Sequence, residues 1–552
     1  MASLFSTENL TSRVTLFLSA LLLWAGMFAC QPRPQPTDSL ESARKAAVER
    51  QRRVIFNNDG DDLLHLDGPA TAEKFLAVRT DHAAGTMVDS VFYFSRRPIS
   101  PLYTGAVTRE PLAGRLRDLA RQGADDLRLV IEASREQGME VFWSMRMNDI
   151  HDNAKPESEI AQWKRDHRHL LMGRPEDKER FPPSDPRNIW TFVDYAHPEV
   201  RDLMVETFKE VLAAYDVDGV DLDFLRHPAF FPETRLFKPV TRPHLEMMTG
   251  MVGRIRAEVL AASRRKGRPI LMSVRVLPTL SQNLHFGFDV EQWARRGFLD
   301  LIVVGGGYDP FTMPAKDMID RGNQWGVPVY VCLSSSGFEH ALGGQRFYST
   351  DADQWGRTLP DADEEVALKV WRAAAANAWL AGAKGIMTFN LFPRHPESRA
   401  TRMARRVWKE IGSPDRLALT NKLYVVENVG SLQGGFMMGS VPVGGRLPVQ
   451  VAPGDSVQRL LPVADELAGA GDRLHSLEFR LKLAGPRKRD TVSVHLNGER
   501  LRLTRRQPDW LIGPVPEQAM RRGNNVVKVK LAAAAPSALT LAALELEVTY
   551  RR

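Results

Sequence analysis

The most informative stretch of the chain is YDVDGVDLDFLRHP, from Tyr215 to Pro228. Its centre, Val217–Phe224, is a short apolar run in which Asp221 and Asp223 occupy alternate positions. Side chains two residues apart in a strand point to the same face, so the two carboxylates share one face and apolar residues occupy the other. The run therefore predicts a strand that is buried on both faces, as in a parallel sheet, with two acidic groups on one of them.

Similar apolar runs occur on both sides of this stretch, each four to eight residues long. They are Val54–Asn57, Met87–Phe94, Glu140–Met147, Pro269–Val276, Leu299–Val304, Val327–Leu333 and Gly385–Phe389. Several of the intervening stretches have the apolar spacing of amphipathic helices: Leu112–Gln122, Pro198–Leu212, Pro243–Arg264 and Asp363–Leu380.

Eight strands that alternate with helices predict an α/β fold, a (β/α)₈ TIM barrel over residues 53–415. This span exceeds the ~250 residues of an ordinary barrel. We therefore expect long insertions after strands three and four, at Ile150–Phe192 and Ala229–Thr241. The alternative is an open doubly wound sheet, but no Gly-rich phosphate loop follows the first strand.

Residues 416–552 have a different pattern, with strict alternation of apolar and polar side chains. Strands are predicted at Ser476–Leu483, Thr491–Leu503, Asn524–Leu531 and Leu539–Tyr550, and Asn497-Gly498 predicts a type I′ hairpin turn. These features predict an antiparallel β-sandwich domain at the C-terminus. It is either a carbohydrate-binding module or a packing platform, and the lack of an obvious exposed aromatic row favours the platform.

The N-terminus predicts export. Arg13 precedes a sixteen-residue apolar run, Val14–Ala29, and Cys30 follows directly. This arrangement is typical of a signal peptide over residues 1–29, and Cys30 resembles the lipid-modified cysteine of bacterial lipoproteins. Residues 30–52 are predicted to form a Pro-rich tether. The protein is then periplasmic, at the cell surface or secreted; a plain signal peptide and an uncleaved anchor are the alternatives to lipidation.

Composition excludes several classes of protein. The 552 residues carry a net charge of +7 with no long basic tract, so we expect no nucleic-acid partner, whereas an acidic polysaccharide is compatible with this charge. Two cysteines exclude a disulfide framework. No CxxC motif or EF-hand spacing is present, and we expect no metal and no cofactor.

Polar side chains recur where the predicted strands end, for example in FNNDGDD after strand one and MRMNDIHD after strand three. In a barrel these ends meet on one face, where active sites form. Asn, Asp and Arg suit the hydroxyl groups of sugars, and Trp143, Trp190 and Tyr308 could stack on sugar rings, although core packing is the better prediction for Trp143. The predicted substrate-binding residues are Asn57, Asp59, Arg146, Asn148, Asp149, Arg226, His227, Arg275, Tyr308 and Asn390.

Asp223 and Asp221 are the candidate catalytic residues. A carboxylate that points into a barrel costs free energy of folding, and such a cost is accepted only where the group has a function or a partner. The alternative is that both make structural hydrogen bonds to arginine or to backbone groups.

The segment DYAHPEVRDLMVETFKEVLAAYDVDG, which leads into this strand, resembles the glycosyl-hydrolase-like family 10 barrels of bacteria. The resemblance implies an exported carbohydrate-active (β/α)₈ enzyme, often with a β-sandwich attached. The strand also resembles the DGxDxDxE signature of family-18 chitinases, since Asp218, Gly219, Asp221 and Asp223 match in order. Leu225 stands where that signature has its catalytic Glu, so chitinase chemistry is not implied.

The leading hypothesis is a glycoside hydrolase that acts on extracytoplasmic poly- or oligosaccharide. Asp223 would be the nucleophile or base, and Asp221, Asp149, Asp59 or Glu339 the acid. The alternative is a non-catalytic glycan-binding lipoprotein with a degenerate glycosidase barrel. A barrel lyase or a sulfated-glycan enzyme that uses His227 and Arg226 is a weaker third hypothesis.

Overall fold

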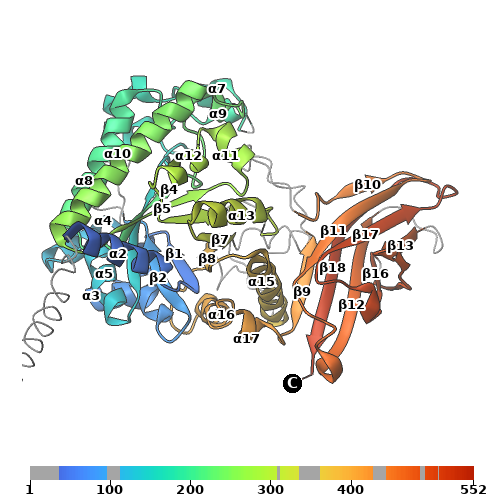
Figure 1. Cartoon of the computed structure of the whole chain (residues 1–552). Coiled ribbons are helices and arrows are strands. Elements are labelled where there is room, and N and C mark those ends of the chain that lie inside the picture. The colour runs from blue at the N-terminus through green and yellow to red at the C-terminus, as the bar shows by residue number, and fades with distance from the viewer. Residues whose placement is uncertain are drawn as a thin grey trace, which may run out of the picture.

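A computed structural model describes the structure of residues 36–95, 112–183, 185–306, 311–334, 361–426, 443–484, 492–507 and 509–551. The chain forms two bodies, an α/β barrel followed by an all-β domain (Figure 1). Cys30, Tyr308 and Glu339, which carry sequence predictions, lie outside the described residues.

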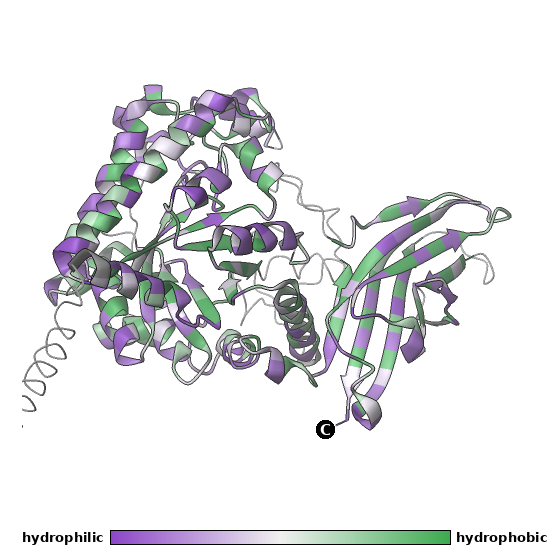
Figure 2. Ribbon diagram, in the orientation of Figure 1, coloured by the Kyte–Doolittle hydropathy of each residue, from purple (hydrophilic) through white to green (hydrophobic). Residues whose placement is uncertain are grey.

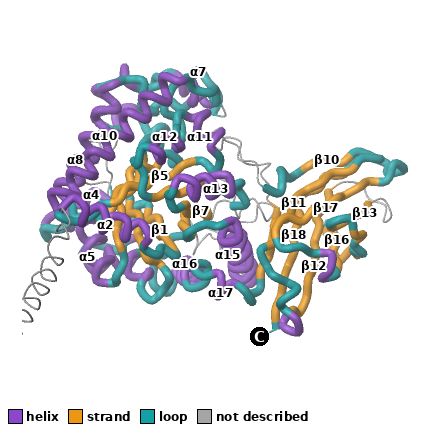
Figure 3. Tube along the Cα trace, in the orientation of Figure 1, coloured by secondary structure: helices purple, strands orange, loops and turns teal. Residues whose placement is uncertain are grey.

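Eight parallel strands close into the predicted barrel, in the order of the sequence, and β1 pairs with both β2 and β8. Helices surround these strands (Figure 3). Each strand lies within the run predicted for it, give or take one residue. The strands are β1 (Val54–Asn58), β2 (Val88–Tyr93), β3 (Glu140–Arg146), β4 (Gly219–Asp223), β5 (Leu271–Val276), β6 (Leu301–Val304), β7 (Val329–Ser334) and β8 (Ile386–Phe389).

The helices confirm the amphipathic pattern. The first helical residue of α8 (Pro198–Ala214) is Pro198, whose fixed φ suits a helix start. The neighbouring α10 (Arg242–Lys266) is followed by Gly267, which has φ +64° and caps the end of the helix. Other barrel helices are α3 (Ala72–Val78), α4 (Leu112–Arg121), α5 (Asp126–Glu136), α11 (Leu280–Phe286), α12 (Val290–Arg295), α13 (Lys316–Trp325), α15 (Asp361–Ala381), α16 (Arg399–Trp408) and α17 (Pro414–Leu417).

The two long insertions follow β3 and β4 as predicted. The α-helices in their described residues are short: α6 (Gln162–Asp166), α7 (Asp177–Arg180) and α9 (Pro232–Arg235). Asn148 joins the two insertions, because its side-chain amide donates to the backbone oxygens of Val193 (3.0 Å) and Ala229 (2.7 Å).

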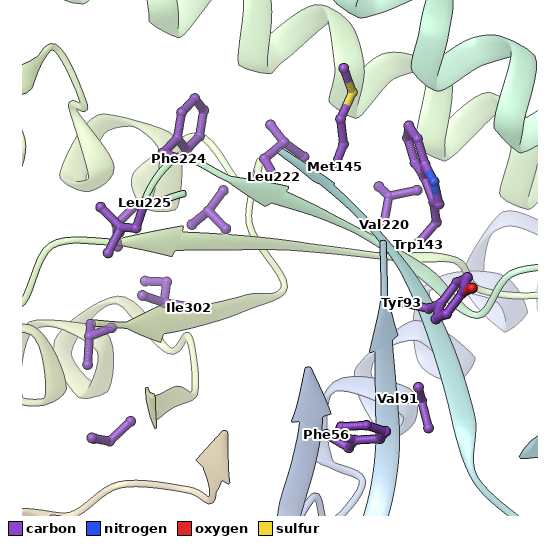
Figure 4. Packing of buried hydrophobic residues seen from close by; sticks show 14 of the residues in the cluster. Phe56, Val91, Tyr93, Trp143, Met145, Val220, Leu222, Phe224, Leu225 and Ile302 are labelled. Carbon is purple, nitrogen blue, oxygen red and sulfur yellow. The ribbon is translucent and has the colours of Figure 1, made fainter. Parts of the chain in front are cut away.

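Strands β3 and β4 separate an apolar outer face from a mixed inner face. Trp143, Met145, Val220 and Leu222 project from these strands on the same side, toward the helices (Figure 4). Trp143 is buried there, as predicted. The intervening positions face the inside of the barrel, where an inner cluster contains Ile55, Phe92, Phe142, Leu271, Leu301, Val303, Tyr330, Cys332, Met387 and Phe389.

The tether predicted over residues 30–52 is wrong for its larger part, since Pro36–Glu49 forms helix α2. Arg44 on this helix donates to Asp300 at 2.7 Å, and Ala47 and Val48 pack against the inner cluster of the barrel. Arg52 then pairs with Glu140, the first residue of β3. The helix forms because the last proline of this segment is Pro36, at its first position, and because contacts with the amino end of the barrel stabilise its later turns.

The C-terminal domain is the predicted antiparallel sandwich. One sheet contains β9 (Lys422–Val426), β10 (Val449–Val451), β12 (Leu474–Ala484), β15 (Thr504–Gln507), β16 (Trp510–Pro514) and β18 (Leu539–Tyr550). The other contains β11 (Ser456–Val463), β13 (Val492–Leu496), β14 (Glu499–Arg500) and β17 (Gly523–Leu531). Polar and apolar residues alternate along these strands (Figure 2). Asn497 (φ 52°) and Gly498 (φ 94°) both have positive φ, as a type I′ turn requires.

Helix α15 joins the barrel to the sandwich. Ala373 belongs to the hydrophobic core of the sandwich, and Lys369 pairs with Glu547 at 2.5 Å. Asn377 donates to the backbone oxygen of Pro462 at 3.1 Å. These contacts agree with a packing role for the domain. No helix in the described part of the chain is long and apolar enough to cross a membrane.

Gly219 allows β4 to lie against the inner aromatic layer. A Cβ at this position would lie 2.2 Å from the Phe142 ring, which stacks on Phe92 at 4.4 Å between ring centroids. We therefore expect Gly219→Ala to destabilise the barrel by about 1–3 kcal/mol through overpacking. Urea denaturation measures this change.

Gly250→Ala is the matched control, because Gly250 lies on α10 and a Cβ there meets no atom within 4 Å. It should stabilise by up to about 1 kcal/mol through helix propensity. Equal effects of the two variants would contradict the packing assigned to Gly219.

Candidate active site

Most of the predicted site residues meet at the carboxyl end of the barrel strands. We call this region the barrel mouth and define it by the side chains of Asn57, Asp59, Arg146, Asp149, His151, Asp223, Arg226, His227, Arg275 and Phe389. They come from β1, β3, β4, β5 and β8 and from the loops that directly follow β1, β3 and β4.

Asp223 and Arg275 form the floor of the mouth. Arg275 Nε donates to Asp223 Oδ1 at 2.9 Å, and Arg275 Nη2 donates to Oδ2. The backbone N–H groups of Leu225 and Arg226 also donate to Oδ1, each at 3.0 Å, so this carboxylate fixes the turn that follows β4. Arg275 Nη1 reaches Asn57 Oδ1 at 3.0 Å. Although burial acts against the charge, Asp223 raises the pKa of Arg275 above its ordinary value.

Asp221 lies one layer deeper and is fully buried. Ser144 Oγ donates to Asp221 Oδ2 at 2.7 Å, whereas Oδ1 has no hydrogen-bond partner. Burial raises the pKa of Asp221 to about 6; Arg275 opposes this shift and Asp223 adds to it.

Asp59 lies between two arginines above this floor. Its Oδ2 is 3.1 Å from Arg146 Nη2 and 3.5 Å from Arg226 Nη2. Burial acts to raise the pKa of Asp59, but Arg146, Arg226 and Arg275 outweigh it and hold that pKa well below the ordinary value. Arg226 also lies over the Phe389 ring, and its Nε and Nη1 have no hydrogen-bond partner.

Asp149, His151 and His227 form one edge of the mouth. Asp149 Oδ1 is 2.6 Å from His151 Nδ1, and Asp149 Oδ2 accepts from Arg146 at 3.1 Å. The two imidazole rings lie 5.0 Å apart between centroids. The pKa of Asp149 is well below its ordinary value: burial acts to raise it, but His151 and Arg146 outweigh burial. Burial lowers the pKa of His227 well below its ordinary value, despite the opposing charge of Asp149.

Each of these three residues offers a ligand atom, and the three atoms lie within 4.8 Å of one another. This group of side chains could therefore hold a metal ion, which the sequence spacing did not predict.

Some predicted residues do not contribute a free functional group. Asn148 is buried and its amide bonds to the backbone of the insertions, so we correct its assignment from sugar binding to a structural role. Trp190 is also buried, at 1% exposure, and cannot stack on a sugar. Asn390 lies at the carboxyl end of β8, half-buried, with φ +57°.

Ser144, Phe389 and Arg79 were not predicted. Arg79 Nη1 donates to Asn58 Oδ1 at 2.8 Å, from a position just after α3. Ser144 and Phe389 follow the inward alternation of their strands, which could have indicated them. Nothing in the sequence around Arg79 indicates that it reaches β1.

Residues 86–233 match the model of the family described as glycosyl hydrolase-like 10. The match runs from the start of β2 into α9 and includes β3, β4 and both insertions. The resemblance of this part of the chain to that family is thereby confirmed. None of the curated proteins compared with this chain matches it.

Solved structures of carbohydrate-active enzymes match this chain at low similarity. A cycloisomaltooligosaccharide glucanotransferase from Paenibacillus sp. is 12% identical with a TM-score of 0.32; the alignment covers 91% of this chain and 57% of the other. An alpha-amylase from Geobacillus thermoleovorans is 11% identical with a TM-score of 0.36; the alignment covers 87% of this chain and 99% of the other. Alpha-L-fucosidase isoenzyme 2 from Paenibacillus thiaminolyticus is 14% identical with a TM-score of 0.40; the alignment covers 67% of this chain and 51% of the other.

The raised pKa of Asp221 makes stability depend on pH. The folded-state pKa of about 6 exceeds the ordinary 3.8, so the contribution of this group to stability is complete below pH 3.8 and is lost as pH rises through 6. We expect Asp221→Asn, which cannot ionise, to be more stable than wild type at pH 8 by up to about 3 kcal/mol. Near pH 4 the two should be similar. Urea denaturation at both pH values measures the difference, and a constant difference between them would contradict the assignment.

Proposed function

We propose that the barrel is a glycoside hydrolase that acts on poly- or oligosaccharide through a pair of carboxyl groups on β4. The observation that carries the proposal is the raised pKa of Asp221 beside Asp223, on a strand that lies within the match to a glycosyl hydrolase-like family. Two neighbouring carboxyl groups in different environments suit acid and base roles in glycoside hydrolysis.

By its pKa, Asp221 is the best of the described candidates for the general acid, although it lies one layer below the floor that Asp223 and Arg275 form. A general acid must keep its proton near working pH, which requires a raised pKa. Asp59 and Asp149 have lowered pKa values, because Arg146 and Arg226 lie beside Asp59 and because His151 and Arg146 lie beside Asp149. These two are therefore better suited to accept hydrogen bonds from sugar hydroxyls.

Asp223 is the proposed nucleophile or base. Arg275 binds both of its oxygens and fixes the direction of the carboxylate, which a reaction at a defined carbon atom needs. In the retaining reaction the nucleophile and the acid lie about 5–5.5 Å apart, and in the inverting reaction about 6.5–9.5 Å.

Arg146 and Arg226 give the mouth positive charge and donors for a sugar that carries negative charge as well as hydroxyl groups. Arg275 supports them from the floor, where its donors bond Asp223 and Asn57. Guanidinium groups bind carboxylate and sulfate oxygens through paired hydrogen bonds. An anionic poly- or oligosaccharide is thus part of the proposal. We further propose that the chain is exported and anchored through Cys30, on the strength of the apolar run Val14–Ala29.

One observation favours a second function, a glycan-binding protein without catalysis. Asp223 accepts four hydrogen bonds and is 2% exposed, which also describes a purely structural carboxylate. A buried residue of this kind holds the β4 turn and Arg275 in place without touching a sugar.

Reducing-sugar release separates the two functions. The full chain is tested on neutral, uronic and sulfated polysaccharides beside Asp221→Asn and Asp223→Asn. Loss of an acid or base should lower the rate about 10²–10⁴-fold. Glu545→Gln is the matched control, because Glu545 is a fully buried carboxyl whose pKa burial raises to about 7, but it lies in the sandwich. It should keep full activity.

Loss of activity could also come from unfolding. Asp223→Asn removes one partner of a buried ion pair and should lower the free energy of unfolding by about 3–5 kcal/mol. Circular dichroism must show that each variant is folded at the assay temperature. Polysaccharide binding without release by wild type would support the glycan-binding function. Equal release by wild type and both β4 variants would exclude these carboxyl groups as the catalytic pair.

The pH dependence tests the role of Asp221 separately. If Asp221 donates the proton, kcat/KM should fall about tenfold per pH unit above pH 6, because the group loses its proton through a pKa of about 6. Initial rates between pH 4 and 9 measure this profile. A rate that stays constant up to pH 8 would assign the acid to another group.

A further inference from the structure

Asp149, His151 and His227 come together from two loops. Asp149 and His151 follow β3, and His227 follows β4. Their ligand atoms lie within 4.8 Å of one another at the edge of the barrel mouth. The carboxylate and the buried imidazole have fixed positions, since Asp149 is 2% and His227 7% exposed.

We propose that these three side chains bind a divalent transition metal ion of the zinc class, with its remaining coordination position open to the barrel mouth. Two imidazoles and one carboxylate are a common zinc donor set at sites that keep one position for water or substrate. Magnesium and calcium prefer oxygen donors and suit this set poorly. The site shares the barrel mouth with the proposed glycosidase, but metal binding can be measured without glycosidase activity.

His151 is the residue that adjusts when the ion binds. Ligands about 2.1 Å from a tetrahedral centre lie about 3.4 Å from one another, so a pair at the 4.8 Å limit must approach by about 1.4 Å. The His151 side chain is 49% exposed and can move without disturbing the core. Its backbone N–H donates to Asp149 Oδ1 at 2.7 Å, which keeps the loop in place during that movement.

Charged groups around the cluster set the affinity. Arg146 bonds Asp149 Oδ2, Arg226 Nη2 lies 3.0 Å from His151 Nε2, and Lys164 bonds the backbone oxygen of Asp149. Lys164 is paired with Asp152, and Asp59 lies beside both arginines. The main competitor for the ion is therefore Arg226, which occupies the space beside His151 Nε2.

Arg226 can give up this place. Its Nε and Nη1 have no hydrogen-bond partner, and the residue is buried, at 8% exposure. The present position therefore leaves two buried N–H donors of Arg226 unpaired. Asp59 Oδ2 is 3.5 Å from Arg226 Nη2. When the ion binds His151, the Arg226 guanidinium can pair with Asp59 alone. Arg226 then lies next to the open coordination position, where it would bind an anionic group of a ligand.

The test uses the full chain, treated with a chelator and titrated with Co²⁺ while visible absorption is recorded. We expect one Co²⁺ per chain, with absorption bands of a four- or five-coordinate ion that Zn²⁺ abolishes. His151→Ala, which alters a half-exposed side chain and should fold normally, should weaken binding at least tenfold. His169→Ala is the matched control, because His169 is an exposed histidine of the same insertion. It should bind like wild type.

Arg226→Gln distinguishes a metal site from a structural cluster. Removal of the competing positive charge should tighten Co²⁺ binding by about tenfold, whereas a structural role predicts no change. Absence of a saturable absorption change in wild type would overturn the proposal. So would equal affinity of wild type and His151→Ala. Neither outcome depends on whether the chain releases sugars.

Discussion

The ion pair between Asp223 and Arg275 is the constraint on which the rest of the barrel mouth depends. Two charged groups are stable inside a barrel only when each satisfies the other, and removal of one would leave the second buried and unpaired. Asp223 also accepts the N–H groups of Leu225 and Arg226, so the same carboxylate directs the loop that carries Arg226 and His227. Arg275 in turn holds Asn57 on β1, across the barrel.

The layers above and below this pair have opposite electrostatic character. Below it, Asp221 accepts a hydrogen bond from Ser144, and burial raises its pKa to about 6. Above it, Asp59 and Asp149 share Arg146, and their pKa values are low. Carboxyl groups of one chemical type thus acquire different proton affinities from their depth in the barrel and from their distance to guanidinium groups.

The barrel could be predicted because its strands are buried on both faces and therefore consist of short apolar runs that contrast with the amphipathic helices. Asp221 and Asp223 were identifiable because a carboxylate is conspicuous in such a run. Helix α2 was not predicted, since residues 36–49 form a helix through contacts with the amino end of the barrel and the prolines before them suggested a stiff tether. Asn148 was assigned to the site because it follows a strand, but its amide satisfies the backbone of both insertions instead.

The barrel, the sandwich, the type I′ turn at Asn497-Gly498 and the set of polar residues at the strand ends could be predicted from the amino-acid order alone. These features follow from local periodicity, turn conformation and the rule that parallel strands end on one face. Only the tertiary structure decided which carboxylate pairs with which arginine, that Asp221 lacks such a partner, and that Asp149, His151 and His227 converge. Those outcomes depend on distances between residues far apart in the chain, such as Asn57 and Arg275, and no local pattern encodes them.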